Sequence, residues 1–528
     1  MPGPTICRAT LLALLLPVGG AVWAHDGAPE KLGKVSFPTS CLPAVQANFQ
    51  RGVALLHSFW FRESEKAFRE VLVRDPECAI AGWGIASSLI GNTFAVGPNP
   101  AQAQQAKEAI ERSRATARQT ERERDFIDAI AQYYDLYPAR PHMQRMKALS
   151  DAFEVVARRF PADDEAQIFS AVYLTATQSL TDKSFAAALK AAAILEAQFM
   201  KHPDHPGVAH YLIHSYDFPE IAEKGMNAAR RYAEIAPSAP HALHMPSHIF
   251  TRVGAWKDSA AINERSAASA TETKEPHDQL HAMDYAVYAY LQLGQDDNAR
   301  RVLRQAREVK DFPQSVRAGP YALAAMPARI ALERGDWAEA AKLELQESNF
   351  PYTKSQTHYA KAIGFARGGN AGAAEPEVRE LARIVEALKG KDDYWMTEVE
   401  VQRLTGTAWV EFARGEREAA LTLMRRAADM EDGNEKSSLT PARMLPAREL
   451  LADMLLAAGR PADALAEYEK SQLREPNRYR GLYGAGQAAA QANNRDKARL
   501  YFSRLVEMAG PGVRSSDLKA VRQYLAGN

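Results

Sequence analysis

Apolar and polar positions alternate with a helical period along nearly the whole chain. Ala-rich amphipathic stretches of about a dozen residues, such as 185–199 and 447–458, are separated by short breaks of Gly, Pro, Asp or Asn. The strict two-residue alternation that is typical of strands is nearly absent. The pattern therefore predicts an all-α protein.

A second pattern recurs on a longer scale: a helix, a Gly near its end, a short turn, and a second helix with an early Ala. The glycines are Gly254, Gly294, Gly335, Gly415 and Gly459, spaced 40, 41, 80 and 44 residues apart. The alanines that follow a glycine by five residues are Ala299, Ala340, Ala420 and Ala464. Helices also stop before prolines, because Pro disfavours helical geometry in the residue before it. Those prolines are Pro76, Pro161, Pro203, Pro237 and Pro476.

This recurring pattern of Gly, Ala and Pro covers most of residues 43–510. It resembles the pattern of the tetratricopeptide-repeat (TPR) family, whose period is about 34 residues. The resemblance implies an α-solenoid, a right-handed superhelix of antiparallel helix pairs, here with lengthened helices or loops. We expect an N-terminal extension over 25–42 and repeats over 43–310 that continue into a second array over 311–528.

The first 24 residues have the composition of a secretory signal. Arg8 is followed by a short apolar run over 11–16, and small residues precede a cleavage site expected after Ala24. We therefore expect a periplasmic or secreted protein, without stable membrane insertion. Cys41 and Cys78 remain after cleavage, and an exported chain permits either a disulfide between them or two buried thiols.

The balanced charge composition bears only on which partners the chain could bind. The chain has 65 basic and 65 acidic residues and a formal net charge of zero. A partner such as nucleic acid usually requires a basic excess, so we expect no nucleic-acid binding.

Histidine is concentrated in one part of the chain. Seven of the 13 histidines lie between residues 202 and 248, in the strings HPGVAHYLIHSYD (205–217) and PHALHMPSHIF (240–250). His210 and His214 are four residues apart, so they share a helix face, as do His244 and His248. The two pairs are offset by 34 residues, which predicts equivalent positions on consecutive first helices.

The TPR resemblance implies that these positions line the concave groove in which repeats of this family hold ligands. It places Asp217 and His241 in the same groove, and the register carried to Gly294 adds three further residues. Those residues are His281, Asp284 and Tyr288. In the first repeat His57 also faces the groove, at a position that lies farther along the array.

Imidazoles that converge from two neighbouring helices favour a metal ion. We predict that His210, His214, His244 and His248 supply most ligands of one divalent ion, with Asp217 and His241 as additions. Zinc, copper and iron all suit imidazole, whereas calcium prefers oxygen ligands. Two alternatives stay open: a structural polar network, and a clamp of protonated histidines for an anionic ligand.

Three functions are compatible with this site. The first is an exported scaffold that binds a protein or peptide in its groove and carries a metal site there. The second is a metal-dependent hydrolase or oxidoreductase, in which the ion activates water or oxygen. The third is a peptide-binding adaptor without metal. The sequence has no phosphate-binding loop, no G-x-S-x-G elbow and no H-E-x-x-H motif, which argues against the enzyme classes that need them.

Overall fold

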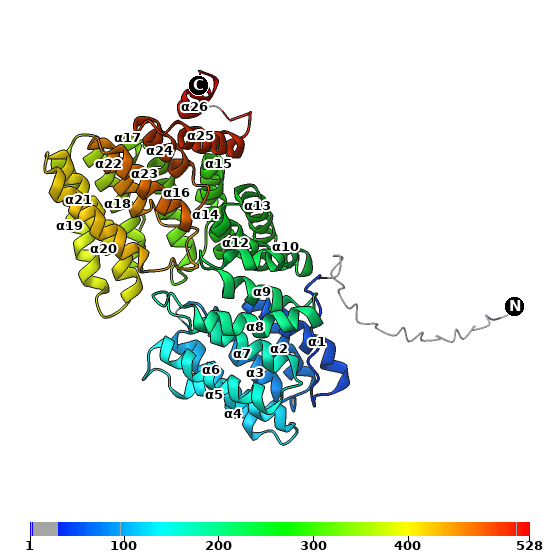
Figure 1. The fold of residues 1–528 in the computed structure, drawn as a ribbon. Coiled ribbons are helices and arrows are strands. Elements are labelled where there is room, and N and C mark those ends of the chain that lie inside the picture. Colours follow the sequence, from blue (N-terminus) through cyan, green and yellow to red (C-terminus); the bar gives the residue numbers. More distant parts are fainter. Residues whose placement is uncertain (2, 4–29, 96, 514, 528) are drawn as a thin grey trace.

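The protein is a helical solenoid (Figure 1). The computed structural model describes residues 1, 3, 30–95, 97–513 and 515–527, and none of these residues belongs to a strand. Successive helices pack against each other along the whole array. The predicted all-α solenoid is therefore confirmed. The predicted signal peptide, apart from residues 1 and 3, lies outside the described residues.

The elements fall into three runs. The first run, blue to cyan in Figure 1, consists of η1 (Pro43–Val45), α1 (Gln46–His57), α2 (Phe61–Arg74), α3 (Ile80–Ile90), α4 (Pro100–Ala115), α5 (Glu121–Asp135), α6 (His142–Arg159), α7 (Asp164–Ala176) and α8 (Ala186–Lys201). The middle run is α9 (Pro206–Tyr216), η2 (Ala222–Gly225), α10 (Met226–Ile235), α11 (Pro240–His244), α12 (Pro246–Val253), α13 (Trp256–Glu272), α14 (Pro276–Gln292) and α15 (Asp296–Glu308). The last run is α16 (Ala318–Arg334), α17 (Trp337–Ala341), α18 (Pro351–Arg367), α19 (Ala371–Leu388), α20 (Asp393–Ala413), α21 (Arg417–Asp432), α22 (Ala447–Ala457), α23 (Pro461–Arg474), α24 (Tyr479–Gln491), α25 (Arg495–Ala509) and α26 (Ser516–Gly527).

The recurring glycines and alanines have the structural role that their pattern predicts. All five glycines follow a helix and have positive φ, and the four paired alanines are fully buried at helix contacts. Gly254 shows why a side chain is excluded. Its φ is +71°, and a Cβ there would lie 2.5 Å from the carbonyl oxygen of Pro476.

The segment before α1 belongs to the core. Phe37 has no exposed surface and lies in an aromatic cluster with Phe49, Trp83 and Phe126, at ring-centroid distances of 5.1 to 5.5 Å. The backbone N–H of Lys34 donates to the carbonyl of Asp204, 3.0 Å away, at the end of α8. Residues 30–42 therefore pack into the first run of helices.

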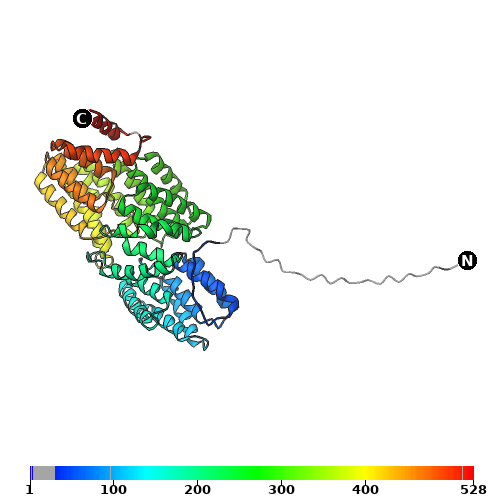
Figure 2. The ribbon, with the colours of Figure 1, turned by 45° about the vertical axis from the view of Figure 1, so that its right-hand side comes forward.

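The array curls so that its last run returns to the middle run (Figures 1 and 2). Helices α14 and α24 are in contact, although most of the last run separates them in sequence. The Tyr479 N–H donates to Gln292 at 2.9 Å, and the Trp256 indole N–H donates to the Asn477 carbonyl at 2.7 Å. Repeats of an open solenoid contact only their neighbours, so this closure encloses space that an open array would leave to solvent.

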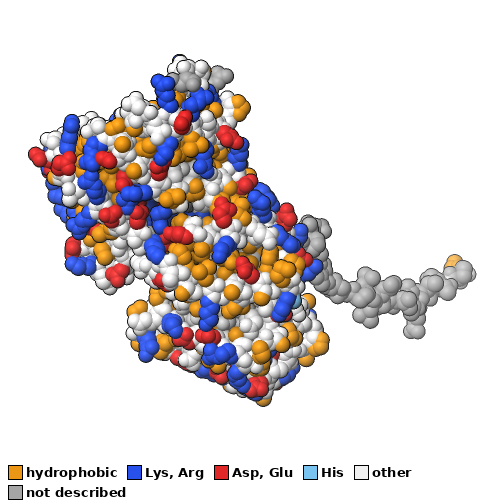
Figure 3. Space-filling view, in the orientation of Figure 1, with side chains coloured by type: hydrophobic (Ala, Val, Ile, Leu, Met, Phe, Trp, Pro, Cys, Tyr) orange, Lys and Arg blue, Asp and Glu red, His pale blue; other side chains and the backbone are white. Residues whose placement is uncertain are grey.

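Basic and acidic side chains are interspersed on the face shown in Figure 3. Among the described residues, none of the helices combines the length and apolar character that crossing a bilayer requires.

Cys41 and Cys78 form a disulfide, which resolves the open choice between a bridge and two thiols. The bridge ties the segment before α1 to the start of α3, across 37 residues.

We expect replacement of both cysteines by Ser to destabilise the first run of helices by about 4 kcal/mol, because the bridge restricts the unfolded chain. The thermal unfolding midpoint of the double variant, compared with the wild type with and without reductant, measures this. Peptide mapping without reductant should recover residues 41 and 78 in one cross-linked pair. Recovery of both as free thiols would contradict the prediction.

Candidate metal centre

The two histidine pairs lie on neighbouring first helices, as their 34-residue offset predicts. His210 and His214 are on α9, His241 and His244 are on α11, and His248 is on α12. Pro246 lacks an N–H donor, and it divides the first helix of the second repeat into α11 and α12. His281, on α14, extends the same row, since its ring centroid lies 4.4 Å from that of His244.

The row is divided into two groups of three. His210, His214 and His241, the first triad, each offer a nitrogen within 4.8 Å of the other two. His244, His248 and His281, the second triad, do the same. The four histidines that the sequence assigns to one ion are thus shared between two groups. The triads adjoin, because the ring centroids of His214 and His248 are 5.9 Å apart.

The first triad presents ring nitrogens without hydrogen-bond partners among the described residues. The His210 Nδ1 lies 2.6 Å from the carbonyl oxygen of His57, which can only accept, so Nδ1 carries the hydrogen and Nε2 the lone pair. The Nε2 atoms of His210, His214 and His241 are all buried without a hydrogen-bond partner among the described residues. Most buried polar groups in folded proteins have a hydrogen-bond partner, so these three nitrogens are available to a ligand.

Hydrogen bonds also orient the second triad. The His244 Nδ1 donates to the Asn263 Oδ1 at 2.7 Å, and the His248 Nδ1 donates to Asp217 at 2.9 Å. The two Nε2 atoms therefore face each other, at a distance of 3.1 Å.

Asp217 is a positioning group. Its carboxylate accepts from the His248 ring and from the Arg252 guanidinium at 2.8 Å, and Lys436 lies 3.6 Å away. Burial opposes ionisation of Asp217, but Lys436 and Arg252 outweigh it and hold the pKa well below its usual range. The carboxylate therefore stays charged and fixes the His248 ring.

Burial keeps the row neutral. It lowers the pKa of His210, His214, His241, His244 and His281 well below the usual value. For His248 burial also lowers the pKa, although Asp217 opposes the shift. Neutral imidazole is the form that ligates metal ions.

His57 belongs to a third group that is already saturated. Its Nε2–H and that of His205 donate to the Glu165 carboxylate at 2.9 and 3.0 Å. The remaining Nδ1 atoms accept from the Tyr211 hydroxyl and from the backbone N–H of Val208. This group is a structural network, and the His57 carbonyl anchors the neighbouring triad.

Two residues of the predicted groove face away from the row into other contacts. Asp284 accepts from the buried Arg329 at 3.1 Å, and burial raises the pKa of Asp284 to about 6. The Tyr288 hydroxyl accepts a hydrogen bond from Arg478, the residue directly before α24. Arg478 comes from a distant repeat, and Arg329 lies on α16, which packs against α14. The register of a single helix could not reveal either contact.

A cavity of about 870 Å³ opens onto the row. The ligand candidates that line it are His214, His241, His248 and His281. Phe59 and Phe94 form part of the wall, and the Phe94 ring stacks on His214 at 4.0 Å between centroids. Asp278, one helical turn before His281, also lines it, and burial raises the pKa of this carboxyl to about 7. Apart from this three-residue spacing, no sequence pattern pointed to Asp278.

The inner loop, residues 433–446 between α21 and α22, packs against α14 and against Asp217 beside the histidine row. The Tyr285 hydroxyl is shared between the Ser438 and Thr440 carbonyls, each 3.1 Å away, and Arg329 donates to the Ala442 carbonyl at 2.8 Å. Ser437, Ser438 and Leu439 of this loop line the cavity. The repeat pattern did not predict this loop, although the 44-residue spacing from Gly415 to Gly459 exceeds the repeat period.

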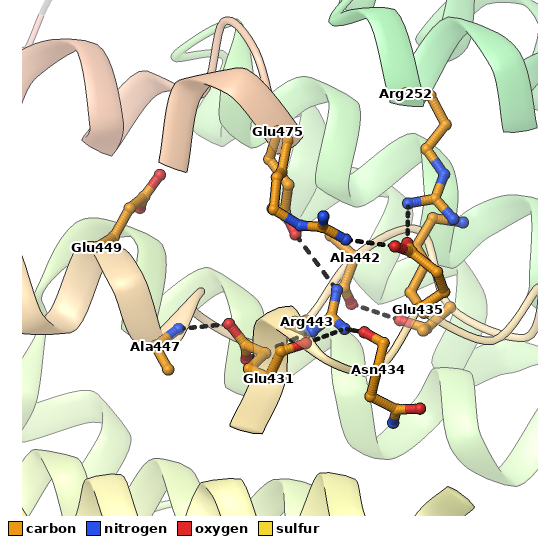
Figure 4. Close-up of polar contacts among 12 residues, drawn as sticks. Arg252, Glu431, Asn434, Glu435, Ala442, Arg443, Ala447, Glu449 and Glu475 are labelled. Carbon is orange, nitrogen blue, oxygen red and sulfur yellow. Dashed lines mark hydrogen bonds and ion pairs between the residues drawn. The ribbon is translucent and has the colours of Figure 1, made fainter. Parts of the chain in front are cut away.

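Ion pairs tie the inner loop to both sides of the closed array (Figure 4). Glu435 pairs with Arg252, Arg474 and Lys183, and these cations lower its pKa to about 2 against the effect of burial. Arg443 reaches Glu431 and Glu475 at 3.4 and 3.8 Å. A peptide in this part of the groove would compete with the loop for space.

No family model and no curated protein matches the chain. Among solved structures, it is similar to a tetratricopeptide repeat protein from Parabacteroides merdae, with 14% identity and a TM-score of 0.29. That similarity covers 55% of this chain and 98% of the other.

The saturated third group yields a stability prediction. Glu165 is buried, yet His57 and His205 hold its pKa well below the usual range. Its contribution is therefore present above the unfolded-state pKa of about 4.3 and is lost as the pH falls below it.

We expect Glu165→Gln to lower the stability at pH 7 by about 1–3 kcal/mol, because an amide cannot accept from both rings. The difference from the wild type should shrink below about pH 4.3. Thermal unfolding midpoints from pH 7 down to about pH 2 measure this. Asp164→Asn, which removes a neighbouring half-exposed partner of His202, is the matched control and should change little.

Proposed function

We propose that the protein binds a transition-metal ion at the first triad and uses that ion to hold a small molecule in the cavity. Two observations carry the proposal: His210, His214 and His241 each offer a ring nitrogen within 4.8 Å of the other two, and their buried Nε2 atoms have no hydrogen-bond partner among the described residues. Three imidazole ligands with a further position open toward a cavity are the arrangement of metal sites that bind a substrate or water.

The hydrogen bonding of the row favours an ion over a purely structural network. In the group of His57, Glu165 and His205, both nitrogens of each ring have partners. In the first triad every Nε2 lacks a partner among the described residues, and each buried polar atom left unpaired costs about 1–3 kcal/mol. Burial also lowers the pKa of these rings, which disfavours an anion clamp made of protonated histidines.

An all-nitrogen ligand set suits zinc, copper or iron. The Phe59 and Phe94 rings, which lie against the first triad, exclude water from one side of it. The ligand in the cavity is a small molecule rather than a peptide, because the inner loop already fills the adjoining groove. Binding of a partner protein elsewhere on the array is compatible with this site.

One observation favours catalysis as a second candidate. Asp278 lines the same cavity, and its pKa of about 7 allows the carboxyl to exchange a proton near neutral pH. A metal-dependent hydrolase or oxidoreductase would use such a group beside the ion.

We also propose that the protein works outside the cytoplasm. The signal-like composition of residues 1–24 and the Cys41–Cys78 disulfide both support an oxidising compartment.

We expect His210→Ala combined with His214→Ala to lose the metal of the first triad, because two of its three ligands are gone. Elemental analysis of the purified protein, after growth with added zinc, copper or iron, measures this. His277→Ala is the matched control, since His277 lines the same cavity but belongs to neither triad. His142 and His358, outside the row, provide further controls. A double variant with full metal content would make the row structural and favour the adaptor function.

We expect metal affinity to persist at pH 6 and to fall only in more acidic solution. Protons compete with the ion for each ring, and burial holds the pKa of His210 and His214 well below the ordinary value of about 6.5. Equilibrium dialysis between pH 7.5 and pH 4.5 measures the affinity. A loss centred near pH 6.5 would show that the ligands are exposed histidines.

A further inference from the structure

The second triad contains two lone pairs that face each other. His244 and His248 are four residues apart, and their Nε2 atoms are separated by 3.1 Å. A hydrogen bond across this distance would need a hydrogen on one of the two atoms. Whether either has one depends on where the Nδ1 hydrogens are.

Both Nδ1 atoms have acceptors that fix their hydrogens. Asp217 is a carboxylate, so it accepts from the His248 Nδ1. For His244 the partner is Asn263, whose amide nitrogen donates to the Ser259 carbonyl at 2.7 Å. This contact directs the Asn263 oxygen toward His244, so the His244 Nδ1 is also a donor. In neutral rings neither Nε2 then has a hydrogen, and the contact is repulsive unless a cation lies between them.

The spacing suits a shared metal ion. Two nitrogens on one tetrahedral zinc ion lie roughly 3.3 Å apart, given Zn–N distances of roughly 2.0–2.1 Å. His281 supplies a third nitrogen from α14, and it makes no hydrogen bond within the described chain that would occupy it. The Asp217 carboxylate behind His248 is the kind of outer partner that orients metal-binding imidazoles.

The second triad is close enough to the first to act with it. The His241 and His244 ring centroids are 6.0 Å apart, and those of His214 and His248 are 5.9 Å apart. Two members of each triad line the same cavity: His214 and His241 of the first triad, and His248 and His281 of the second. A ligand that enters this cavity therefore meets both groups.

We propose that the second triad binds a second divalent transition-metal ion, so that the six histidines form a two-metal centre that holds a small bridging ligand, such as hydroxide, on its cavity side. This inference rests on the proposed function of the first triad. It adds a second ion, which the sequence pattern of two i, i+4 pairs did not predict.

The test counts ions in the full mature protein and in three single variants. His241→Ala removes one ligand from the first triad, His281→Ala removes one from the second, and His277→Ala is the control in the same cavity. His241 and His281 are the most exposed member of each triad, and circular dichroism verifies that each variant is folded. The probe is Cu(II), added to metal-free protein and freed of excess by gel filtration.

We expect about two copper ions per wild-type and His277→Ala chain, and about one in His241→Ala and in His281→Ala. Electron paramagnetic resonance provides a second measurement that needs no variant. Coupling between the two ions should weaken or broaden the wild-type signal relative to its copper content, and each single variant should give the full signal of an isolated ion.

One ion per wild-type chain, retained in His281→Ala, would overturn the two-metal centre and leave the proposed function intact. Two ions that are both retained in His281→Ala, with uncoupled spectra, would also overturn it. Absence of stoichiometric copper in the wild type, with zinc and iron equally absent, would overturn both the second site and the proposed function.

Discussion

The candidate site depends on the stacking of equivalent first helices. In a helical-repeat array, each repeat adds a helix pair in nearly the same orientation, so residues at the same repeat position form a column. The pair on α9 and the pair on α11 and α12 occupy one such column, and α14 adds His281. No single helix of this array could place six imidazoles close together on one face. The repeat itself therefore brings the ligands together.

Stacking alone does not decide which nitrogen each ring presents. For three rings, a carbonyl, an amide oxygen and a carboxylate accept the Nδ1 hydrogens, and this leaves the Nε2 lone pairs inside the row. The carboxylate is Asp217. It contacts Arg252 on α12 and Lys436 in the inner loop. The orientation of His248 thus depends on a loop that follows it by almost 200 residues in the sequence.

The sequence predicted what is periodic and local, and it could not predict what the closure of the array determines. Gly254 and the 34-residue offset of His210 and His244 follow from repeat geometry, and the structure places them as expected. The division into two triads was not predictable, since His241 and His244 lie three residues apart on α11 and yet belong to different triads. Asp284 and Tyr288 have the correct register, but Arg329 on the adjacent helix α16 and Arg478 from a distant repeat bind them.

The unpaired nitrogens also connect metal binding to stability. Each buried ring nitrogen without a partner destabilises the metal-free chain by about 1–3 kcal/mol, and an ion that binds it removes that cost. An ion bound only by the folded protein also stabilises it, by an amount that grows with its affinity. Asp217 contacts both His248 and the inner loop, so this stabilisation acts where the early and late repeats meet. Occupation of the centre and closure of the array should therefore reinforce each other.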